Sequence, residues 1–279
     1  MDQLLTSGAG RPTGYIVPLV ALGLMVLEYL YGRLREIDAY DVRETAASWI
    51  IAIGNKLLRV VSAGVVAVPI LWVWQHRLFD IPLDRAWALA ALVLAVEFFY
   101  YWHHVAMHRV RWFWATHGVH HSATRMNFSA AIRLGWGGDL TGGVLFYLPL
   151  AWLGFHPAGI VAALGIGLLY QFFLHTTLAP RLGPLEWLLN TPRHHCVHHA
   201  SNDACLDKNF GSMLILYDRL FGTFAEAPAG EPLRFGLKNK DVRPNNPLAV
   251  VLCGWRDIAQ GLRRATTWRG RVAAVFGRP

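Results

Sequence analysis

Histidine is concentrated in three short segments of this chain, and each segment borders a long apolar stretch. The segments read HHVAMH at 103–108, HGVHH at 117–121 and HHCVHH at 194–199. Neutral imidazole is the commonest nitrogen ligand for iron, zinc and copper, and gathering many imidazoles near a bilayer is costly unless metal occupies their lone pairs. The pattern therefore predicts an all-imidazole metal centre at a membrane surface.

The spacing inside each segment supports metal binding. On a helix, His104 and His108 are four residues apart and share one face. The second segment offers histidines three and four residues apart, and the third repeats that spacing; these are His117, His120, His121, His195, His198 and His199. One such pair carries little weight, but three matched segments are hard to explain by chance.

The composition indicates a membrane protein. Hydrophobic residues make up 54% of the chain and charged residues only 16%, which is apolar for a soluble domain. Residues 13–31, 47–74 and 86–104 are long enough to span a bilayer, whereas 140–155 and 157–178 form a predicted helical hairpin whose first arm is short for a crossing. We expect an all-α integral membrane protein of four or five membrane helices with a histidine-rich helical cap, folded as a single domain over residues 1–279.

Basic residues predict the orientation of this protein. One topology places a large group of arginines in loops on the same side, namely Arg33, Arg35, Arg43, Arg109, Arg111, Arg125 and Arg133. The opposite side then holds only Arg11, Arg77 and Arg85, together with His76 and His156. By the positive-inside rule the first side is cytoplasmic, so all three histidine segments face the cytoplasm, and a bacterial inner membrane is the expected location.

The region after Pro180 is polar and basic, with 14 Lys and Arg against 8 Asp and Glu in residues 181–279. Residues 248–264 are expected to form an amphipathic helix on the bilayer surface, with Trp255 and Trp268 in the interface. Its arginines and those that follow would lie near anionic head groups; they are Arg256, Arg263, Arg264, Arg269 and Arg271. A basic rim without lipid preference explains the same charges, and binding to nucleic acid is not expected.

The cysteines do not form a metal motif of their own. Cys196, Cys205 and Cys253 include no C-x-x-C pair, and a cytoplasmic location disfavours disulfides. Cys196 lies inside the third histidine segment. Because thiolate suits zinc or copper better than an oxygen-activating imidazole site, we expect Cys196 to point away from the metal.

With their flanking residues, these segments resemble the fatty acid hydroxylase and sterol desaturase superfamily of integral-membrane, non-haem di-iron enzymes. The resemblance covers most of residues 90–279, with a histidine-box core at about 90–225. The boxes H-x3-H, H-x2-HH and H-x2-HH correspond to residues 104–108, 117–121 and 195–199. The surrounding words EFFYYWHHVAMH, WATHGVHHSATRMNFSAAIR, LNTPRHHCVHHASN and CLDKNFGSMLILYDRLFGTF look most like the alkylglycerol monooxygenase-like branch and its bacterial relatives.

The resemblance implies two iron ions, with zinc as the alternative occupant, and nine candidate ligands: His104, His108, His117, His120, His121, His175, His195, His198 and His199. For His175, at the end of the hairpin, a hydrogen-bonded structural role stays open, and His103 and His194 are ambiguous. The chain departs from common family patterns at two positions. Val105 replaces an arginine, which leaves a register from His103 open although the preceding aromatic residues favour His104. Gln171 replaces a histidine of some relatives, which predicts a more open shell for one metal.

Polar residues near the boxes are candidates for supporting the ligands. Glu97 precedes His104 by seven residues on roughly the same helical face and is predicted to accept an N–H from a ligand imidazole, although packing against another polar group is an open alternative. Asn127 is expected to brace the second box. The third box is expected to be braced by Asp207, Lys208, Asn209 and Asp218.

The resemblance implies oxygen-dependent hydroxylation of an alkyl, acyl or sterol-like lipid, with desaturation by the same site as the alternative. A zinc-dependent membrane hydrolase or a metal transporter is a candidate of another class, but a carboxylate base beside three zinc ligands and ligands at mid-membrane are both absent from the pattern. Lipid would enter between helices lined by residues such as Phe98, Phe99, Phe172 and Phe173. No haem domain, iron–sulfur cysteine set or nucleotide loop is evident, so electrons must come from a separate cytochrome, ferredoxin or reduced pterin.

Overall fold

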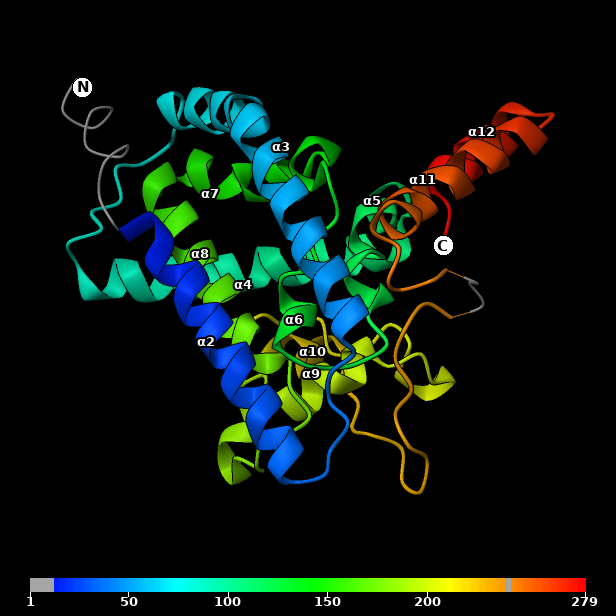
Figure 1. Ribbon diagram of the computed structural model, residues 1–279. Coiled ribbons are helices and arrows are strands. Elements are labelled where there is room, and N and C mark those ends of the chain that lie inside the picture. Colours follow the sequence, from blue (N-terminus) through cyan, green and yellow to red (C-terminus); the bar gives the residue numbers. More distant parts are fainter. Residues whose placement is uncertain (1–12, 239–241) are drawn as a thin grey trace.

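The computed structural model describes residues 13–238 and 242–279 (Figure 1). Arg11, which the orientation prediction uses, lies outside these residues. Within the described part the fold is all-helical, and the β-structure consists of two isolated bridges, Leu189 to Leu214 and Ala200 to Phe235. The predicted all-α class is confirmed.

Four helices are long and apolar enough to cross a membrane. They are α2 (Thr13–Leu34), α3 (Val42–Gln75), α4 (Ala86–Arg109) and α8 (Pro157–Leu174). Large apolar side chains cover their outer faces; on α3, for example, Val60 and Val61 are 75% and 80% exposed. Such surfaces are costly in water and favourable in a hydrocarbon layer, so the prediction of an integral membrane protein agrees with the outward-facing surface.

The predicted hairpin is only half formed, because residues 140–155 do not make one continuous helix. They divide into η2 (Gly138–Thr141), η3 (Gly143–Tyr147) and α7 (Leu148–Leu153). Gly142 and Gly154 adopt φ values of 94° and 120°, a left-handed conformation that interrupts an α-helix on each side of the segment. The described residues therefore contain four candidate spans, and the second arm ends at Leu174 rather than at residue 178.

The membrane core joins α3, α4, α7 and α8 through buried residues that include Ile70, Leu92, Leu150 and Ile160. The cap is built from short elements between and after the spans: α5 (Arg111–His117), η1 (His120–Ser122), α6 (Phe128–Ala131), η4 (Gly183–Trp187), α9 (Pro192–His199), η5 (Asp203–Cys205) and α10 (Leu216–Phe221). These elements gather where α4 and α8 end and α3 begins (Figure 1). The first histidine box therefore lies at the end of the long helix α4, whereas short helices packed nearby hold the second and third boxes.

The C-terminal helices α11 (Pro247–Arg264) and α12 (Trp268–Phe276) form an arm beside α5 (Figure 1). The helix expected at 248–264 is confirmed. Its apolar stripe is largely used in packing: Val250 and Val251 are buried, and a Cβ on Gly254 would lie 2.5 Å from Ala115 Cα.

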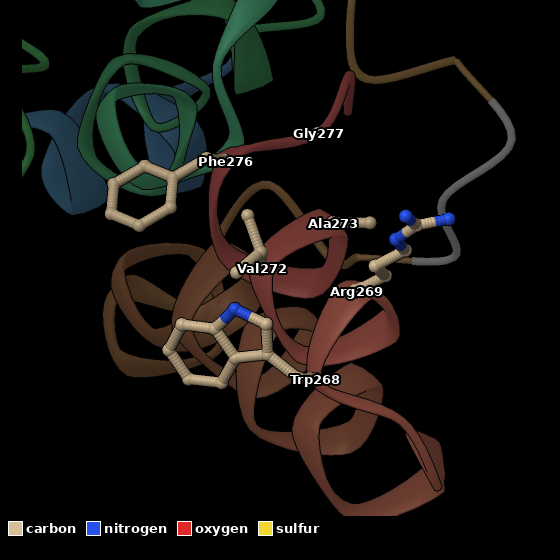
Figure 2. A pocket seen from close by; sticks show the side chains of 6 residues that line it. All are labelled: Trp268, Arg269, Val272, Ala273, Phe276 and Gly277. Carbon is tan, nitrogen blue, oxygen red and sulfur yellow. The ribbon is translucent and has the colours of Figure 1, made fainter.

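The two tryptophans expected in the membrane interface differ in their surroundings. Trp255 packs against Trp112 with ring centroids 5.2 Å apart, whereas Trp268 is 77% exposed. Trp268, Val272 and Phe276 line an open apolar hollow of about 460 Å³ on α12 (Figure 2). Both helices of the arm therefore carry outward-facing apolar side chains, with Leu248 exposed on α11 and Trp268 and Phe276 on α12.

Candidate metal centre

The nine histidines come together in two groups, and each group is compact enough to hold a metal ion. His104, His108, His117, His121 and His198 form a five-histidine group, and His120, His175, His195 and His199 form a four-histidine group; within each, the candidate ligand atoms lie within 4.8 Å of one another. The three boxes and the residue after α8 thus converge from segments as much as 95 positions apart.

The two groups are adjacent. The rings of His121 and His199, one from each group, stack with centroids 4.3 Å apart. Helix α9 supplies both groups: His195 and His199 are four residues apart and serve the smaller one, while His198 serves the larger. The H-x2-HH spacing of this box therefore divides its histidines between two neighbouring sites.

Backbone carbonyls orient three of the imidazoles. Nδ1 of His104 lies 2.7 Å from the carbonyl oxygen of Phe210, Nδ1 of His175 lies 2.7 Å from that of Gln171, and Nδ1 of His198 lies 2.8 Å from that of Lys208. A carbonyl oxygen can only accept, so each Nδ1 carries the proton and each Nε2 keeps its lone pair. This is the arrangement that a metal-ligating histidine requires.

The Nε2 atoms are arranged for a metal rather than for hydrogen bonds among themselves. His117 Nε2 lies 3.0 Å from His104 Nε2 and 3.1 Å from the Nε2 atoms of both His108 and His121. Similarly, His175 Nε2 lies 3.1 Å from those of His120 and His195. A single N–H cannot serve several neighbours at once, whereas one cation can engage all these lone pairs. The donor set therefore fits a metal in each group.

Burial favours the uncharged form of these side chains. His104, His120, His121, His175, His195, His198 and His199 are all buried. Removal from water lowers the pKa of His120 to about 4 and that of His198 to about 3. Both side chains are consequently neutral at pH 7, the form that binds a metal.

The ambiguous histidines lie outside both groups. His103 Nδ1 is 3.2 Å from the Tyr147 hydroxyl, and its ring stacks on Phe146, whereas the His194 ring packs edge-on against Phe224. Of the two registers of the first box, the geometry favours the one that begins at His104. His76 and His156 are also outside the groups; they contact a helix backbone at the end of α3 and the beginning of α8.

A loop after the third box, residues 207–211, braces two boxes through its backbone. The Lys208 and Phe210 carbonyls accept the Nδ1–H groups of His198 and His104. Asn209 holds the loop by donating to the His194 carbonyl at 3.0 Å. Asp218 accepts the backbone N–H groups of Phe210 and Gly211, both at 2.7 Å. The ligands thus depend on the conformation of this loop as well as on its side chains.

Two of the predicted supporting residues have other partners. The prediction that Glu97 accepts from a ligand imidazole is wrong, because its Oε2 accepts the backbone N–H groups of Met213 and Leu214, both at 2.9 Å. Two turns separate it from His104, a rise of about 10 Å along the helix. Asn127 caps α6 through Ser129 and donates to the Ala39 carbonyl, so it contacts no ligand imidazole directly.

Asp207 lies next to a candidate ligand without a hydrogen bond to it. Its Oδ1 is 3.8 Å from His108 Nδ1, and its Oδ2 is 3.9 Å from Arg109 Nε. Its φ of 57° is left-handed, a conformation that aspartate tolerates better than most residues. Asp207 therefore offers a negative charge near the five-histidine group.

Gln171 faces away from the metal groups. Its Oε1 accepts the Tyr100 hydroxyl at 2.7 Å, and its Nε2 donates to Ser212 Oγ at 3.0 Å. Only its backbone carbonyl reaches His175. Gln171 lies beside the four-histidine group. Because Gln171 stands where some relatives have a histidine, fewer ligands are expected in this group, and it has four members against five in the other.

The cysteines do not join either group. Cys196, Cys205 and Cys253 form no disulfide, and Cys196 Sγ contacts the Thr176 carbonyl oxygen at 3.5 Å. Burial raises the pKa of Cys196 to about 12, so the thiol stays protonated.

One supporting residue escaped the sequence analysis. Arg133 is fully buried and donates to Ser122 Oγ at 2.8 Å, Ser48 Oγ at 3.2 Å and the Pro244 carbonyl at 2.5 Å. It thereby joins the second box to α3 and to the segment before α11. The available signal was an arginine between two apolar stretches, SAAIRLGW, but the sequence interpretation used it only for orientation.

Comparison with known proteins agrees with this site. Residues 89–223 match the family model for fatty acid hydroxylase, and this range contains all nine histidines. This region of the chain matches the fatty acid hydroxylase family. Similar proteins of known name include the alkylglycerol monooxygenase of Xenopus tropicalis, 35% identical over 222 residues that cover 77% of this chain and 47% of the relative.

Two further relatives extend the comparison. The human alkylglycerol monooxygenase is 44% identical over 155 residues, which cover 55% of this chain and 34% of the relative. The ornithine lipid hydroxylase of Rhizobium tropici is 32% identical over 152 residues, covering 53% of this chain and 45% of the relative. The chain thus spans about half or less of the length of these relatives. No solved structure gives a significant match.

Proposed function

We propose that this protein is an oxygen-dependent lipid hydroxylase that holds two iron ions in its histidine groups. The observation that carries the proposal is the convergence of nine imidazoles into two adjacent groups whose Nε2 atoms face one another. Hydrolytic zinc sites commonly use three protein ligands with a carboxylate base. Here the donors are all imidazole, and the buried carboxylate on α4, Glu97, is committed to backbone N–H groups.

Iron bound in these groups would supply the reduction of dioxygen and the removal of hydrogen from an unactivated C–H bond. The chain's own residues keep the ligands neutral, fix their tautomers and exclude water. The carbonyls of Phe210, Gln171 and Lys208 fix the tautomers of three of these histidines. Because the four-histidine group offers one fewer protein ligand, we infer that its ion has more room for an external ligand.

The names of the relatives support a lipid substrate. Two are alkylglycerol monooxygenases and one is an ornithine lipid hydroxylase, so a lipid with an alkyl or acyl chain is the substrate class that we propose. The aromatic side chain most suited to line its entry is Phe172, which stacks on Phe128 of the cap at 4.9 Å. Phe98 instead packs against Tyr217 and Phe221. The lipid would enter from the bilayer beside α8.

The proposed setting is an integral membrane enzyme, in a bacterial inner membrane, whose metal groups face the cytoplasm. The four apolar helices and the arginine-rich loops on the side of the boxes support this orientation. A separate cytochrome, ferredoxin or reduced pterin would deliver electrons. An arm with exposed Trp268 and nearby arginines suits contact with anionic head groups.

The test is lipid mass spectrometry of membranes with and without the protein under ¹⁸O₂, beside His120→Ala and His198→Ala variants. Label entering one lipid class only with the intact protein is the expected result. Loss of two hydrogens without label would instead identify a desaturase. No histidine-dependent change in an iron-loaded, reductant-supplied sample would overturn the proposal and favour a hydrolase or a metal transporter.

A further inference from the structure

Glu28 is a buried carboxylate on a membrane helix, outside the residues that match the family model. It is 7% exposed, and with Met25 and Gly32 it forms the buried stripe of α2, which packs against α6 of the cap. Acidic side chains inside membrane segments are costly and are usually retained for binding or transport. The fold therefore gives Glu28 a position that needs an explanation.

Only one of its two oxygens has partners. Oε2 accepts the Tyr40 hydroxyl at 2.5 Å and the Phe128 backbone N–H at 2.8 Å. Oε1 is buried and has no partner at normal hydrogen-bond geometry among the described residues; the Thr176 side chain is its polar neighbour and interacts with the carboxyl group. A buried acceptor without a donor is unfavourable by about 1–3 kcal/mol, so Oε1 is suited to receive a donor from outside the chain.

The surroundings of Glu28 point to a lipid. Thr176 directly follows His175 of the four-histidine group, and Phe128 stacks on Phe172 of α8. Tyr40 also lines a cavity of about 170 Å³ at the end of α2, together with Tyr29, Arg33 and Asp38. Glu28 is thus joined through Tyr40 to a polar cavity, and it interacts with Thr176, the residue that follows His175.

We propose that Glu28 Oε1 accepts a hydrogen bond from the polar end of the lipid substrate, from a hydroxyl or an ammonium group, and so selects lipids that carry such a donor. This inference rests on the proposed lipid hydroxylase function. Glu28 is here a specificity residue: it binds the polar end, and the histidine groups act on the chain. The alternative is that Glu28 only tethers α2 to the cap through Oε2.

One substitution separates these roles. Glu28→Gln keeps a carbonyl oxygen for Tyr40 and Phe128 while converting the unpaired oxygen into an N–H donor. The hydrogen bonds to Tyr40 and Phe128 are thereby retained, and the proposed acceptor becomes a donor. Tyr40→Phe is the matched control, because it weakens the tether at Oε2 and leaves Oε1 unchanged.

The readout is equilibrium binding to iron-loaded, full-length protein in nanodiscs without oxygen. The probes are a long-chain alkylglycerol and its di-O-methyl derivative, which lacks the donors. The wild-type protein and Tyr40→Phe are expected to bind the free alkylglycerol about tenfold more tightly, the size expected when a buried acceptor gains a donor. Glu28→Gln should lose this preference and keep its metal. An unchanged preference in Glu28→Gln, or no preference in the wild type, would overturn the proposal.

The experiments distinguish a failure of the lipid hydroxylase function from a failure of the proposed site at Glu28. If Glu28→Gln abolishes the preference in binding but no protein oxidises lipid under ¹⁸O₂, the site at Glu28 stands and the hydroxylase function fails. If the wild type and Glu28→Gln oxidise both probes with the same ratio of kcat/KM values, the function stands and the site fails. An ornithine lipid and its N-acetylated form, run in parallel, show whether an ammonium group is the preferred donor.

Discussion

The two histidine groups are built from the same residue type but supported differently. The five-histidine group is supported by the loop at 207–211. The Phe210 and Lys208 carbonyls of this loop orient two histidines of the group. The four-histidine group is anchored to a membrane helix, because His175 bonds to the Gln171 carbonyl at the end of α8. One group thus depends on a long-range loop contact and the other on local helix geometry, and this difference predicts different sensitivities to substitution.

The largest effect is expected from removing ligands. His195→Ala leaves three histidines in the smaller group, whereas His108→Ala leaves four in the larger. We expect His195→Ala to lose one metal and more than about 100-fold in activity, because even the residues behind metal ligands cost about 10–100-fold. Metal analysis and lipid oxidation rates measure this.

His103→Ala is the matched control for those variants, since His103 adjoins a ligand in sequence but bonds to Tyr147. It should retain both metals. Equal metal loss in His195→Ala and His108→Ala would show that the difference in group size has no consequence for binding.

The next effect concerns the loop. Asp218 is fully buried and accepts two loop N–H groups and the Thr223 hydroxyl. Asp218→Ala leaves these donors unpaired, at a cost of about 2–4 kcal/mol in the free energy of unfolding. Thermal unfolding should show the loss, and titration with a chelator should empty the five-histidine group first. Preferential loss from the four-histidine group would contradict the support assigned to this loop.

A smaller effect is expected on the helix side. Gln171→Ala removes the hydrogen bonds to Tyr100 and Ser212 but keeps the carbonyl that orients His175. Stability should fall by about 1–3 kcal/mol while both metals remain. Denaturant unfolding and metal content measure the two quantities separately. A loss of metal without a loss of stability would mean that the Gln171 side chain acts on the site after all.

The smallest effect is expected at Asp207, which lies 3.8 Å from His108 Nδ1 and is 38% exposed. Asp207→Asn keeps a residue that tolerates a positive φ and removes only the charge. Metal affinity of the five-histidine group should fall by less than about tenfold and depend on salt, as expected for a partly exposed charge. A loss as large as that of His108→Ala would make Asp207 a ligand rather than a neighbour.

Local spacing allowed most of the centre to be predicted. The i, i+3 and i, i+4 separations identified eight of the nine histidines that the two groups contain, because such separations bring side chains to one face of a short helix. The ninth, His175, was a candidate through the family resemblance and its place at the end of an apolar helix. The same reasoning failed at Glu97. It lies near the face of His104 but two turns away, and its partners, Met213 and Leu214, come from a segment more than a hundred residues later.

Hydropathy predicted the four membrane-spanning helices but not the division of the segment between α4 and α8. It located α2, α3, α4 and α8, since an apolar run of this length must satisfy its backbone internally in lipid. It extended residues 140–155 into one helix, because it does not register the left-handed glycines Gly142 and Gly154 that divide the segment. Arg133 was missed as a supporting residue for a different reason: its partners Ser48 and Pro244 lie on segments distant in sequence. The contact of Glu28 with Phe128 is equally distant.

By itself, the sequence determined the helical membrane class, the family and the candidate ligands, because hydrophobic length and histidine spacing are local properties of the chain. The tertiary structure decided how the ligands divide into five and four, which carbonyls fix their tautomers, and which buried acid keeps an unpaired oxygen. Those features depend on atoms from distant segments meeting at hydrogen-bond distance. Such meetings follow from the packing of the whole fold.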